Sequence, residues 1–259
     1  GEGDATAWWR AGAALVVAVA LQVGVNYAND YSDGVRGTDG AARVGPLRLV
    51  GSGLVEPRLV KRAATASFAG AGVAGAVLAV VVGPELFVVG LACLIAGWTY
   101  TGGPRPYGYL GLGEVFVFVF FGLVATAGTT FAAIESVTAL SLVVGSAVGS
   151  LACALLVINN LRDIPTDREV GKRTLAVRLG DGRTRWFYAF LVAAAFALTA
   201  AAAAWRAPVL LGFAAAPFAV APVRSVLGGA GGPALIPVLG ATGRLQLIWG
   251  ALVTVGLSI

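Results

Sequence analysis

The chain alternates long apolar runs with short polar segments, which is the pattern of helices that cross a membrane. A spanning helix needs about 20 mostly apolar residues. Eight runs approach this length: 8–28, 63–83, 85–100, 112–133, 137–158, 186–204, 208–223 and 245–259. Several carry Gly and Ala at close spacing, as in "SFAGAGVAGAVLAVVVG", and such small residues let membrane helices pack closely. The pattern predicts an all-α polytopic membrane protein with eight spans.

Composition supports this fold class and excludes several kinds of site. The chain is 58% hydrophobic and 12% charged, with a mean hydropathy of +0.86, whereas a soluble domain is roughly 25% charged. Histidine is absent, which excludes histidine general bases, haem-ligating histidines and histidine metal sites. Cys93 and Cys153 each lie inside an apolar run, where we interpret them as small buried residues.

Basic residues predict the orientation of the spans. Sixteen of the 18 Lys and Arg residues fall in alternate loops, namely 29–62, 101–111, 159–185 and 224–244. Only Arg10 and Arg206 fall on the other side. Cytoplasmic loops carry an excess of Lys and Arg, so we expect these four loops in the cytoplasm and both termini outside. The net charge of +5 is explained in this way, and we expect no nucleic-acid partner.

A cluster of polar residues, "NYANDYSDGVRGTD", closes the first span. Asn26, Asn29, Asp30 and Asp33 are spaced by three and four residues, so they share one face if the helix continues. Gly34 and Gly37 can end that helix, and Asp39 would then lie in the loop.

A second cluster, "VINNLRDIPTDREVGKRTLAVRLG", closes the fifth span. Asn159, Asp163 and Asp167 are again spaced by four, and Asn160 precedes Asp163 by three. Pro165 predicts a bend or a stop of the helix between the two aspartates. Both clusters lie at predicted cytoplasmic ends of membrane helices, which allows them to face one cavity.

Carboxylates at such positions repel each other and lose solvation, so a cation is expected to hold them. Oxygen donors without His or Cys favour Mg²⁺, Ca²⁺ or Mn²⁺, and Mg²⁺ takes its remaining ligands from water and phosphate. The nearby basic residues suit a metal-bound diphosphate: Arg48, Arg162, Lys172 and Arg173. The alternative is that each cluster is an ordinary polar helix end. Two clusters of one type, each followed by basic residues, favour a functional site.

At these motifs the sequence resembles a known family. "NDYSDGVRGTD" followed by "RVGPLRLVGSG", and later "NNLRDIPTDREVGKRTLAVRLG", resemble the UbiA superfamily of intramembrane aromatic prenyltransferases. The loop "YTGGPRPYGYLGLGE" is similar to that of its menaquinone-pathway branch, the 1,4-dihydroxy-2-naphthoate polyprenyltransferases. The likeness runs from about Trp8 to about Gly180.

The resemblance implies a helical bundle of nine spans around a central cavity. The motif helix is second in the family and first here, so we expect residues 1–259 to form a single prenyltransferase domain that lacks the family's first helix. The family's first motif often has a further aspartate, but that position is Gly37 here, and no role is assigned to Asp39.

The resemblance also implies the reaction and its residues. A polyprenyl diphosphate and 1,4-dihydroxy-2-naphthoate would give demethylmenaquinol, CO₂ and diphosphate, at a bacterial plasma membrane with the active site on the cytoplasmic side. The catalytic residues would be Asp30, Asp33, Asp163 and Asp167. Asn26, Asn29, Asp30 and Asp33 would hold one Mg²⁺, and Asp163 and Asp167 a second. The basic residues named above would bind the diphosphate.

Other interpretations remain open. Tyr107, Tyr109 and Glu114 would orient the aromatic acceptor, or the tyrosines would anchor helix ends at the membrane interface. The acceptor would instead be another aromatic compound, such as 4-hydroxybenzoate, in a different branch of the superfamily. A cation-coupled transporter is a further alternative, although its carboxylates usually lie near the bilayer midplane.

Overall fold

The computed structural model describes residues 2–38, 45 and 47–259, with side chains from residue 8 onward. Within these ranges the regular elements are helices, and they divide the chain into two compact units. The first unit comprises residues 1–110 and 127–137, and the second comprises residues 111–126 and 138–259.

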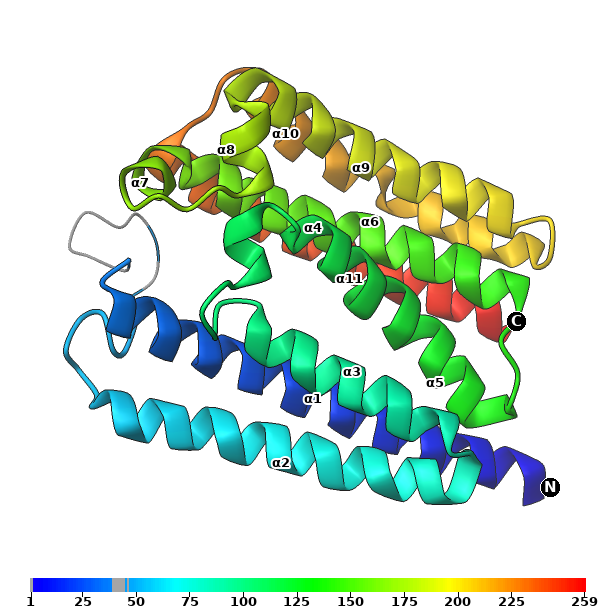
Figure 1. The fold of residues 1–259 in the computed structure, drawn as a ribbon. Helices are drawn as coiled ribbons and strands as arrows, with labels where there is room; N and C mark the ends of the chain where they lie inside the picture. The colour runs from blue at the N-terminus through cyan, green and yellow to red at the C-terminus, as the bar shows by residue number, and fades with distance from the viewer. Residues whose placement is uncertain (1, 39–44, 46) are drawn as a thin grey trace. The chain divides into compact units, whose positions relative to one another are not determined.

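In the first unit, three helices run side by side (Figure 1). They are α1 (Glu2–Arg36), α2 (Pro57–Val82) and α3 (Glu85–Thr99), and the short helix η1 (Tyr107–Leu110) follows them. Most of α5 (Ala125–Ile134) also belongs to this unit, and Arg10 of α1 forms an ion pair of 2.7 Å with Glu135 just after α5.

The second unit is built around α6 (Ala139–Arg162), which contacts α9 (Asp181–Ala202), α11 (Leu235–Ser258) and η2 (Phe118–Val124). The other elements of this unit are shorter: α4 (Gly113–Val117), α7 (Ile164–Glu169), α8 (Leu175–Leu179), η3 (Ala207–Ala215), α10 (Ala216–Leu227) and η4 (Gly232–Ala234).

All eight predicted runs are helical. Among the described residues, seven helical stretches are long and apolar enough to cross a membrane. The eighth predicted run is α3, which has only 15 residues. Small shifts of the ends follow local chemistry. For example, α2 starts six residues early because Pro57 suits the first helical turn, where its missing N–H costs nothing.

Two predicted boundaries are wrong. Gly34 lies inside α1 and does not end it, whereas Gly37, with φ +72°, follows the last helical residue in the left-handed conformation that glycine tolerates. The predicted end of the loop 224–244 is also wrong, because α11 begins at Leu235 and contains Arg244. The polar pair Arg244 and Gln246 interrupts the apolar pattern, and Pro237 resembles a loop residue but sits in the first helical turn.

Buried polar groups inside the second unit are paired. Trp249 Nε1 donates to Thr199 Oγ1 at 3.0 Å, and the hydroxyls of Tyr188 and Thr242 lie 2.8 Å apart. Cys153 is buried as predicted, while Cys93 is half-buried. Hydrogen bonds of this kind tie membrane helices together, since lipid offers no alternative partner.

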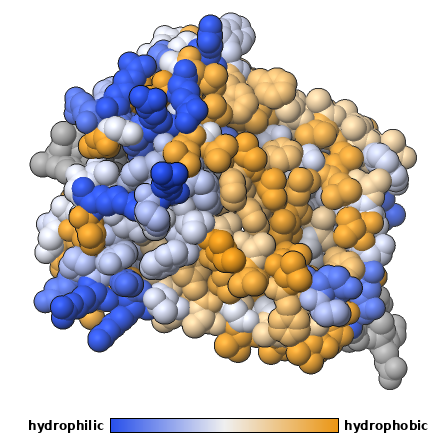
Figure 2. Space-filling view, viewed as in Figure 1, coloured by the Kyte–Doolittle hydropathy of each residue, from blue (hydrophilic) through white to orange (hydrophobic). Residues whose placement is uncertain are grey.

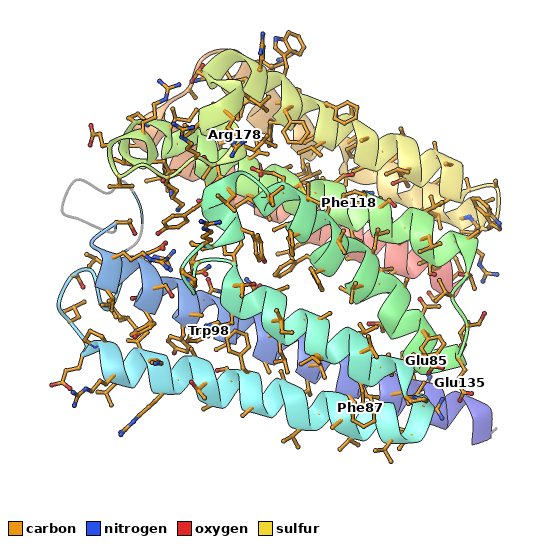
Figure 3. The ribbon with its side chains drawn as sticks, in the orientation of Figure 1. Glu85, Phe87, Trp98, Phe118, Glu135 and Arg178 are labelled. Atoms are coloured by element: carbon orange, nitrogen blue, oxygen red, sulfur yellow. The ribbon has the colours of Figure 1, made fainter. Side chains whose placement is uncertain are left out.

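Small residues bring η2 and α6 into close contact. A side chain at Gly149 would lie 2.9 Å from the carbonyl oxygen of Phe118 and 3.0 Å from its ring. Figure 3 shows Phe118 on η2. This contact holds the start of the helical stretch Gly113–Ile134 against α6.

Polar residues gather at one end of each unit (Figure 2). In the first unit they cover the end where α1 stops and α2 begins, and in the second they cover α7 and α8. Apolar side chains along α2, such as Val73 and Val80, are 67% and 77% exposed. Exposed apolar faces on long helices are what a protein surrounded by lipid requires.

Candidate active site

The first polar motif lies on the last three turns of α1, which continues through it to Arg36. Successive helical residues are rotated by about 100°, so Asn29 and Asp33 lie about 40° apart, and Asn26 lies between them and Asp30. Asp30 and Gly34 lie on the adjacent face. The structure therefore divides the motif between two faces of one helix, and each face contacts a different loop.

The face that carries Asn29 and Asp33 holds the loop that follows α3. Thr101 Oγ1 donates to Asn29 Oδ1, and the Tyr109 hydroxyl donates to Asp33 Oδ1, each at 2.7 Å. Arg36 donates to the carbonyl oxygens of Thr101 and Gly103. Asp33 is only 6% exposed, so this loop both shields the carboxylate and orients it.

The adjacent face holds the segment that precedes α2. Asp30 is 6% exposed, and its two carboxylate oxygens accept the backbone N–H groups of Leu49 and Val50, each at 2.9 Å. Arg48, a predicted diphosphate ligand, immediately precedes this pair and is half-buried. Asn26 is exposed and its Nδ2 donates to the Gln22 carbonyl oxygen, one turn earlier in the same helix.

The two predicted acceptor tyrosines of the first unit have different partners. The Tyr107 hydroxyl donates to the Ala96 carbonyl oxygen of α3 at 2.9 Å, and its ring packs edge-on against Tyr100. The Tyr109 ring faces the guanidinium of Arg36 at 5.4 Å. Burial raises the pKa of both phenols, and the charge of Asp33 raises the pKa of Tyr109 further. Both tyrosines are therefore protonated donors at physiological pH.

The second polar motif lies where α6 ends. As predicted, the helix stops between the two aspartates: α6 ends at Arg162, and α7 begins at Ile164 with Pro165 in its first turn. Arg162 is 6% exposed and donates from Nε and Nη2 to the two carboxylate oxygens of Asp163, each at 2.7 Å. A paired fork of this kind fixes both the position and the plane of the carboxylate.

Asp167 lies one turn beyond, with its N–H donating to the Asp163 carbonyl oxygen at 2.8 Å. Its carboxylate accepts from Thr174 Oγ1 at 3.4 Å and lies 3.7 Å from Lys172 Nζ. Arg173 is exposed, and its carbonyl oxygen accepts from Nε of Arg178 (Figure 3) at 3.2 Å. Two of the three basic residues predicted to bind diphosphate in this unit, Arg162 and Lys172, thus lie directly beside its aspartates.

Glu114, at the start of α4, joins the second motif. It is 4% exposed, and its Oε1 accepts a hydrogen bond of 2.9 Å from Asn160 Nδ2. Its other oxygen, Oε2, is buried without a hydrogen-bond partner among the described residues. A buried carboxylate oxygen of this kind is a candidate ligand or proton-binding atom.

Several residues near the motifs were missed from the sequence. Arg36, Thr101 and Thr38 all contact the first motif or Tyr109. The signal for Arg36 was its place in the last turn of the motif helix, but Thr101 carried no signal, because only the folded loop brings it to Asn29. Asp39 lies outside the described residues.

The donor atoms present suit magnesium. No group of three or more Asp, Glu, Cys or His side chains in the described part of the chain converges on one point. Mg²⁺ usually needs only one or two protein carboxylates and completes its shell with water and phosphate. Asn29 with Asp33 in the first unit, and Asp163 with Asp167 in the second, fit this requirement without any nitrogen or sulfur ligand.

Comparisons with known proteins agree with these motifs. Residues 1–228 match the UbiA prenyltransferase family. A 1,4-dihydroxy-2-naphthoate octaprenyltransferase of Mycobacterium tuberculosis is 52% identical over 95% of this chain and 84% of its own length. The protein with the same name from Mycobacterium leprae is 49% identical over 97% of this chain and 85% of its own length. The one from Escherichia coli is 36% identical over 99% of this chain and 89% of its own length.

Solved structures share the fold. A UbiA homolog from Archaeoglobus fulgidus bound to DMAPP and Mg²⁺ matches with a TM-score of 0.60 at 18% identity, over 95% of this chain and 88% of that one. The same homolog bound to GPP and Mg²⁺ matches with a TM-score of 0.62 at 16% identity, over 96% and 88%.

Proposed function

Because this chain belongs to the UbiA prenyltransferase family, we propose that it transfers a polyprenyl chain to 1,4-dihydroxy-2-naphthoate. The donor is a polyprenyl diphosphate, and the products are demethylmenaquinol, CO₂ and diphosphate, a step of menaquinone biosynthesis. The observation that carries this proposal is the 52% identity to a 1,4-dihydroxy-2-naphthoate octaprenyltransferase over 95% of the chain. The paired polar residues at the ends of α1 and α6 support it.

The first motif supplies oxygen donors for one Mg²⁺ from Asn26, Asn29 and Asp33. Asp30, the fourth residue predicted for this set, has both oxygens hydrogen-bonded to Leu49 and Val50. Tyr109 keeps one oxygen of Asp33 in place and leaves its other oxygen to a ligand. The related structures with Mg²⁺ and an isoprenyl diphosphate support this choice of metal.

The second motif supplies Asp163 and Asp167 for a second Mg²⁺. Arg162 presents the Asp163 carboxylate in one plane, and Lys172 lies beside Asp167. Arg162, Lys172 and Arg173, with Arg48 in the first unit, donate to diphosphate oxygens. When bound, Mg²⁺ neutralises the negative charge that the leaving diphosphate acquires.

The chemistry breaks the allylic C–O bond and the bond between the naphthoate ring and its carboxyl group, and it forms one C–C bond. The electron pair of the C–O bond leaves with diphosphate, and an electron-rich carbon of the naphthoate ring attacks the prenyl cation as the carboxyl group departs as CO₂. Tyr107 and Tyr109 offer ring faces in the first unit, and Glu114 offers a buried carboxylate oxygen in the second. We assign these three residues to the aromatic acceptor. Apolar surroundings exclude the water that would quench the cation.

The protein is a multi-pass membrane protein, and we place its active site on the cytoplasmic side of the bacterial plasma membrane. The support is the distribution of Lys and Arg, which gather in the loops that carry both motifs. That location suits the substrates, since the polyprenyl tail is lipid-soluble while its diphosphate and the naphthoate come from water.

The test is an assay of the purified protein with labelled polyprenyl diphosphate, Mg²⁺ and one acceptor at a time. We expect a lipid-soluble naphthoquinol, with one CO₂ per product, from 1,4-dihydroxy-2-naphthoate and only with a divalent metal. A product from 4-hydroxybenzoate alone would assign the chain to another acceptor. No product from either acceptor, together with cation-driven uptake into vesicles, would replace the enzyme with a transporter.

A further inference from the structure

Asp30 uses both of its carboxylate oxygens to bind a distant turn of the chain, a contact that we call the clasp. Its Oδ2 accepts the Leu49 N–H and its Oδ1 accepts the Val50 N–H, each at 2.9 Å. The carboxylate therefore binds two consecutive backbone groups from a segment 19 and 20 residues further along the chain. Hydrogen bonds to an ionised group are stronger than neutral ones, and here both lie in a part-buried position.

Gly34, one turn after Asp30, completes the same contact. A Cβ at this position would lie 2.5 Å from Val50 Cγ1 and 2.6 Å from Val50 Cβ, which is closer than carbon atoms approach. Gly34 has ordinary helical geometry within α1, so its missing side chain serves the close approach of Val50 rather than a special backbone angle. The face formed by Asp30 and Gly34 is thus shaped to receive one turn of chain.

That turn is braced internally. The Arg48 carbonyl oxygen accepts both the N–H and the hydroxyl of Ser52, at 3.0 Å and 2.5 Å. The Val50 carbonyl oxygen accepts the Gly53 N–H at 3.0 Å, and the Leu49 carbonyl oxygen accepts the Val55 N–H at 3.1 Å. A braced turn moves as one piece, so anchoring two of its N–H groups also fixes the backbone of Arg48.

We propose that Asp30 is a positioning residue that clasps the Leu49–Val50 turn and thereby places Arg48 for the diphosphate, and that it acts in this way rather than as a metal ligand. Asn29 and Asp33, on the adjacent face, keep the metal role. The part of this inference that concerns diphosphate rests on the proposed function, whereas the clasp itself does not.

The clasp is tested by amide hydrogen exchange of the metal-free protein, read on peptides that cover residues 47–53. Asp30→Asn keeps the size of the side chain but turns one acceptor into an NH₂ group that faces an N–H. We expect exchange at Leu49 and Val50 to become about tenfold faster or more. Gly34→Ala, which changes no oxygen ligand, is expected to have the same effect. Asp33→Asn is the matched control and leaves these two amides unchanged.

Unchanged exchange at Leu49 and Val50 in Asp30→Asn would overturn the clasp. Peptides from α6 and α9 report whether a variant is folded. If Asp30→Asn fails that check, Gly34→Ala carries the test, because it alters the same contact from the opposite partner.

The link to Arg48 is tested by a double-mutant cycle on the KM for polyprenyl diphosphate and on the Mg²⁺ concentration at half-activity. If Asp30 acts through Arg48, Asp30→Asn and Arg48→Gln each raise this KM, and the double variant is no worse than Arg48→Gln alone. The Mg²⁺ requirement of Asp30→Asn then follows the wild type, while that of Asp33→Asn rises. The proposal is overturned if the KM increases of Asp30→Asn and Arg48→Gln multiply in the double variant. It is also overturned if Asp30→Asn raises the Mg²⁺ requirement while Gly34→Ala does not, because Asp30 would then be a metal ligand. A wild type without prenyl transfer would instead reject the proposed function and leave the exchange result intact.

Discussion

Asn160 Nδ2 donates a hydrogen bond of 2.9 Å to Glu114 Oε1, which ties the start of α4 to the helix that carries the second aspartate motif. The two residues are 46 positions apart in the sequence. Glu114 is 4% exposed, so its carboxylate is held beside the motif and away from water. Its Oε2 is buried without a partner among the described residues, which is the basis for proposing that it binds a hydroxyl group of the aromatic acceptor.

Glu114→Gln is expected to impair use of the aromatic acceptor. Glutamine can still accept from Asn160 but cannot carry a negative charge or exchange a proton. We expect kcat/KM for 1,4-dihydroxy-2-naphthoate to fall by about a hundredfold to ten-thousandfold, the usual range for a positioned acid or base, while the KM for polyprenyl diphosphate stays unchanged. Steady-state kinetics with each substrate varied in turn measure both.

Glu135→Gln is the matched control for Glu114→Gln. Glu135 is a carboxylate outside both motifs, and its side chain is 57% exposed where it pairs with Arg10. Its partner Arg10 is only 11% exposed, so loss of the pair is expected to lower stability, but Glu135 lies outside both motifs and activity should match the wild type. Equal losses in both variants would show that the Glu114 effect is general destabilisation.

Tyr109→Phe is expected to impair activity, because the Tyr109 hydroxyl contacts a motif aspartate. Tyr107→Phe is expected to affect stability, because the Tyr107 hydroxyl contacts only the backbone of α3. Tyr109 donates to Asp33, whereas Tyr107 donates to the Ala96 backbone. We expect Tyr109→Phe to lower kcat and raise the Mg²⁺ requirement several-fold. Tyr107→Phe should lower thermal stability by about 1 kcal/mol and leave the Mg²⁺ requirement unchanged. An unchanged Mg²⁺ response in Tyr109→Phe would contradict the role of its hydroxyl at Asp33.

The pH dependence of the Tyr109 contribution follows from its raised pKa. The folded-state pKa lies above the ordinary value of 10.0 because of burial and the charge of Asp33. The hydroxyl is therefore protonated in both folded and unfolded chains below about pH 10, and its stabilising effect is lost only as pH rises through the folded pKa. The ratio of wild-type to Tyr109→Phe activity should thus be constant between about pH 6 and 9. A ratio that changes tenfold across this window would contradict the assignment.

Asp163→Asn is expected to abolish prenyl transfer while the protein still inserts into the membrane. The substitution keeps the size of a side chain that Arg162 grips at two points but removes the charge that a metal needs. We expect a loss of about a hundredfold or more. Asp33→Asn should behave alike. Near-normal activity of either purified variant, checked by circular dichroism for helix content, would reject the metal assignment.

Gly149→Ala is expected to destabilise the second unit. The added methyl group would meet the Phe118 carbonyl oxygen at 2.9 Å and the Phe118 ring at 3.0 Å. Overpacking of this kind costs about 1–3 kcal/mol. Gly250→Ala is the control, because no heavy atom lies within 4 Å of its added methyl group. Thermal unfolding in detergent should show a lower Tm for Gly149→Ala only; equal shifts would reject close packing as the cause.

Much of the fold could be predicted from the sequence, because a bilayer imposes one rule on every segment. All backbone groups must be paired within the segment, so an apolar run of sufficient length is helical. The ends of the helices follow less directly from the pattern, since they depend on single residues. Gly34 and Gly37 look alike as helix stops, yet only Gly37 adopts a positive φ, whereas Gly34 makes room for Val50. Arg244 resembles a loop residue because it is charged, yet it lies inside α11. Polarity alone does not end a helix.

The sequence by itself determined the helical membrane fold, the two polar motifs and the family, since each depends on residue types at short, fixed spacings. Only the tertiary structure decided what each motif residue contacts. The spacing of the motif does not distinguish Asp30 from Asp33. In the structure they lie on different faces of α1: Asp30 binds the Leu49–Val50 turn, and Asp33 binds Tyr109. The physical reason is that their partners lie 19 to 76 residues away, and no local pattern specifies which distant group meets a side chain once the chain has folded.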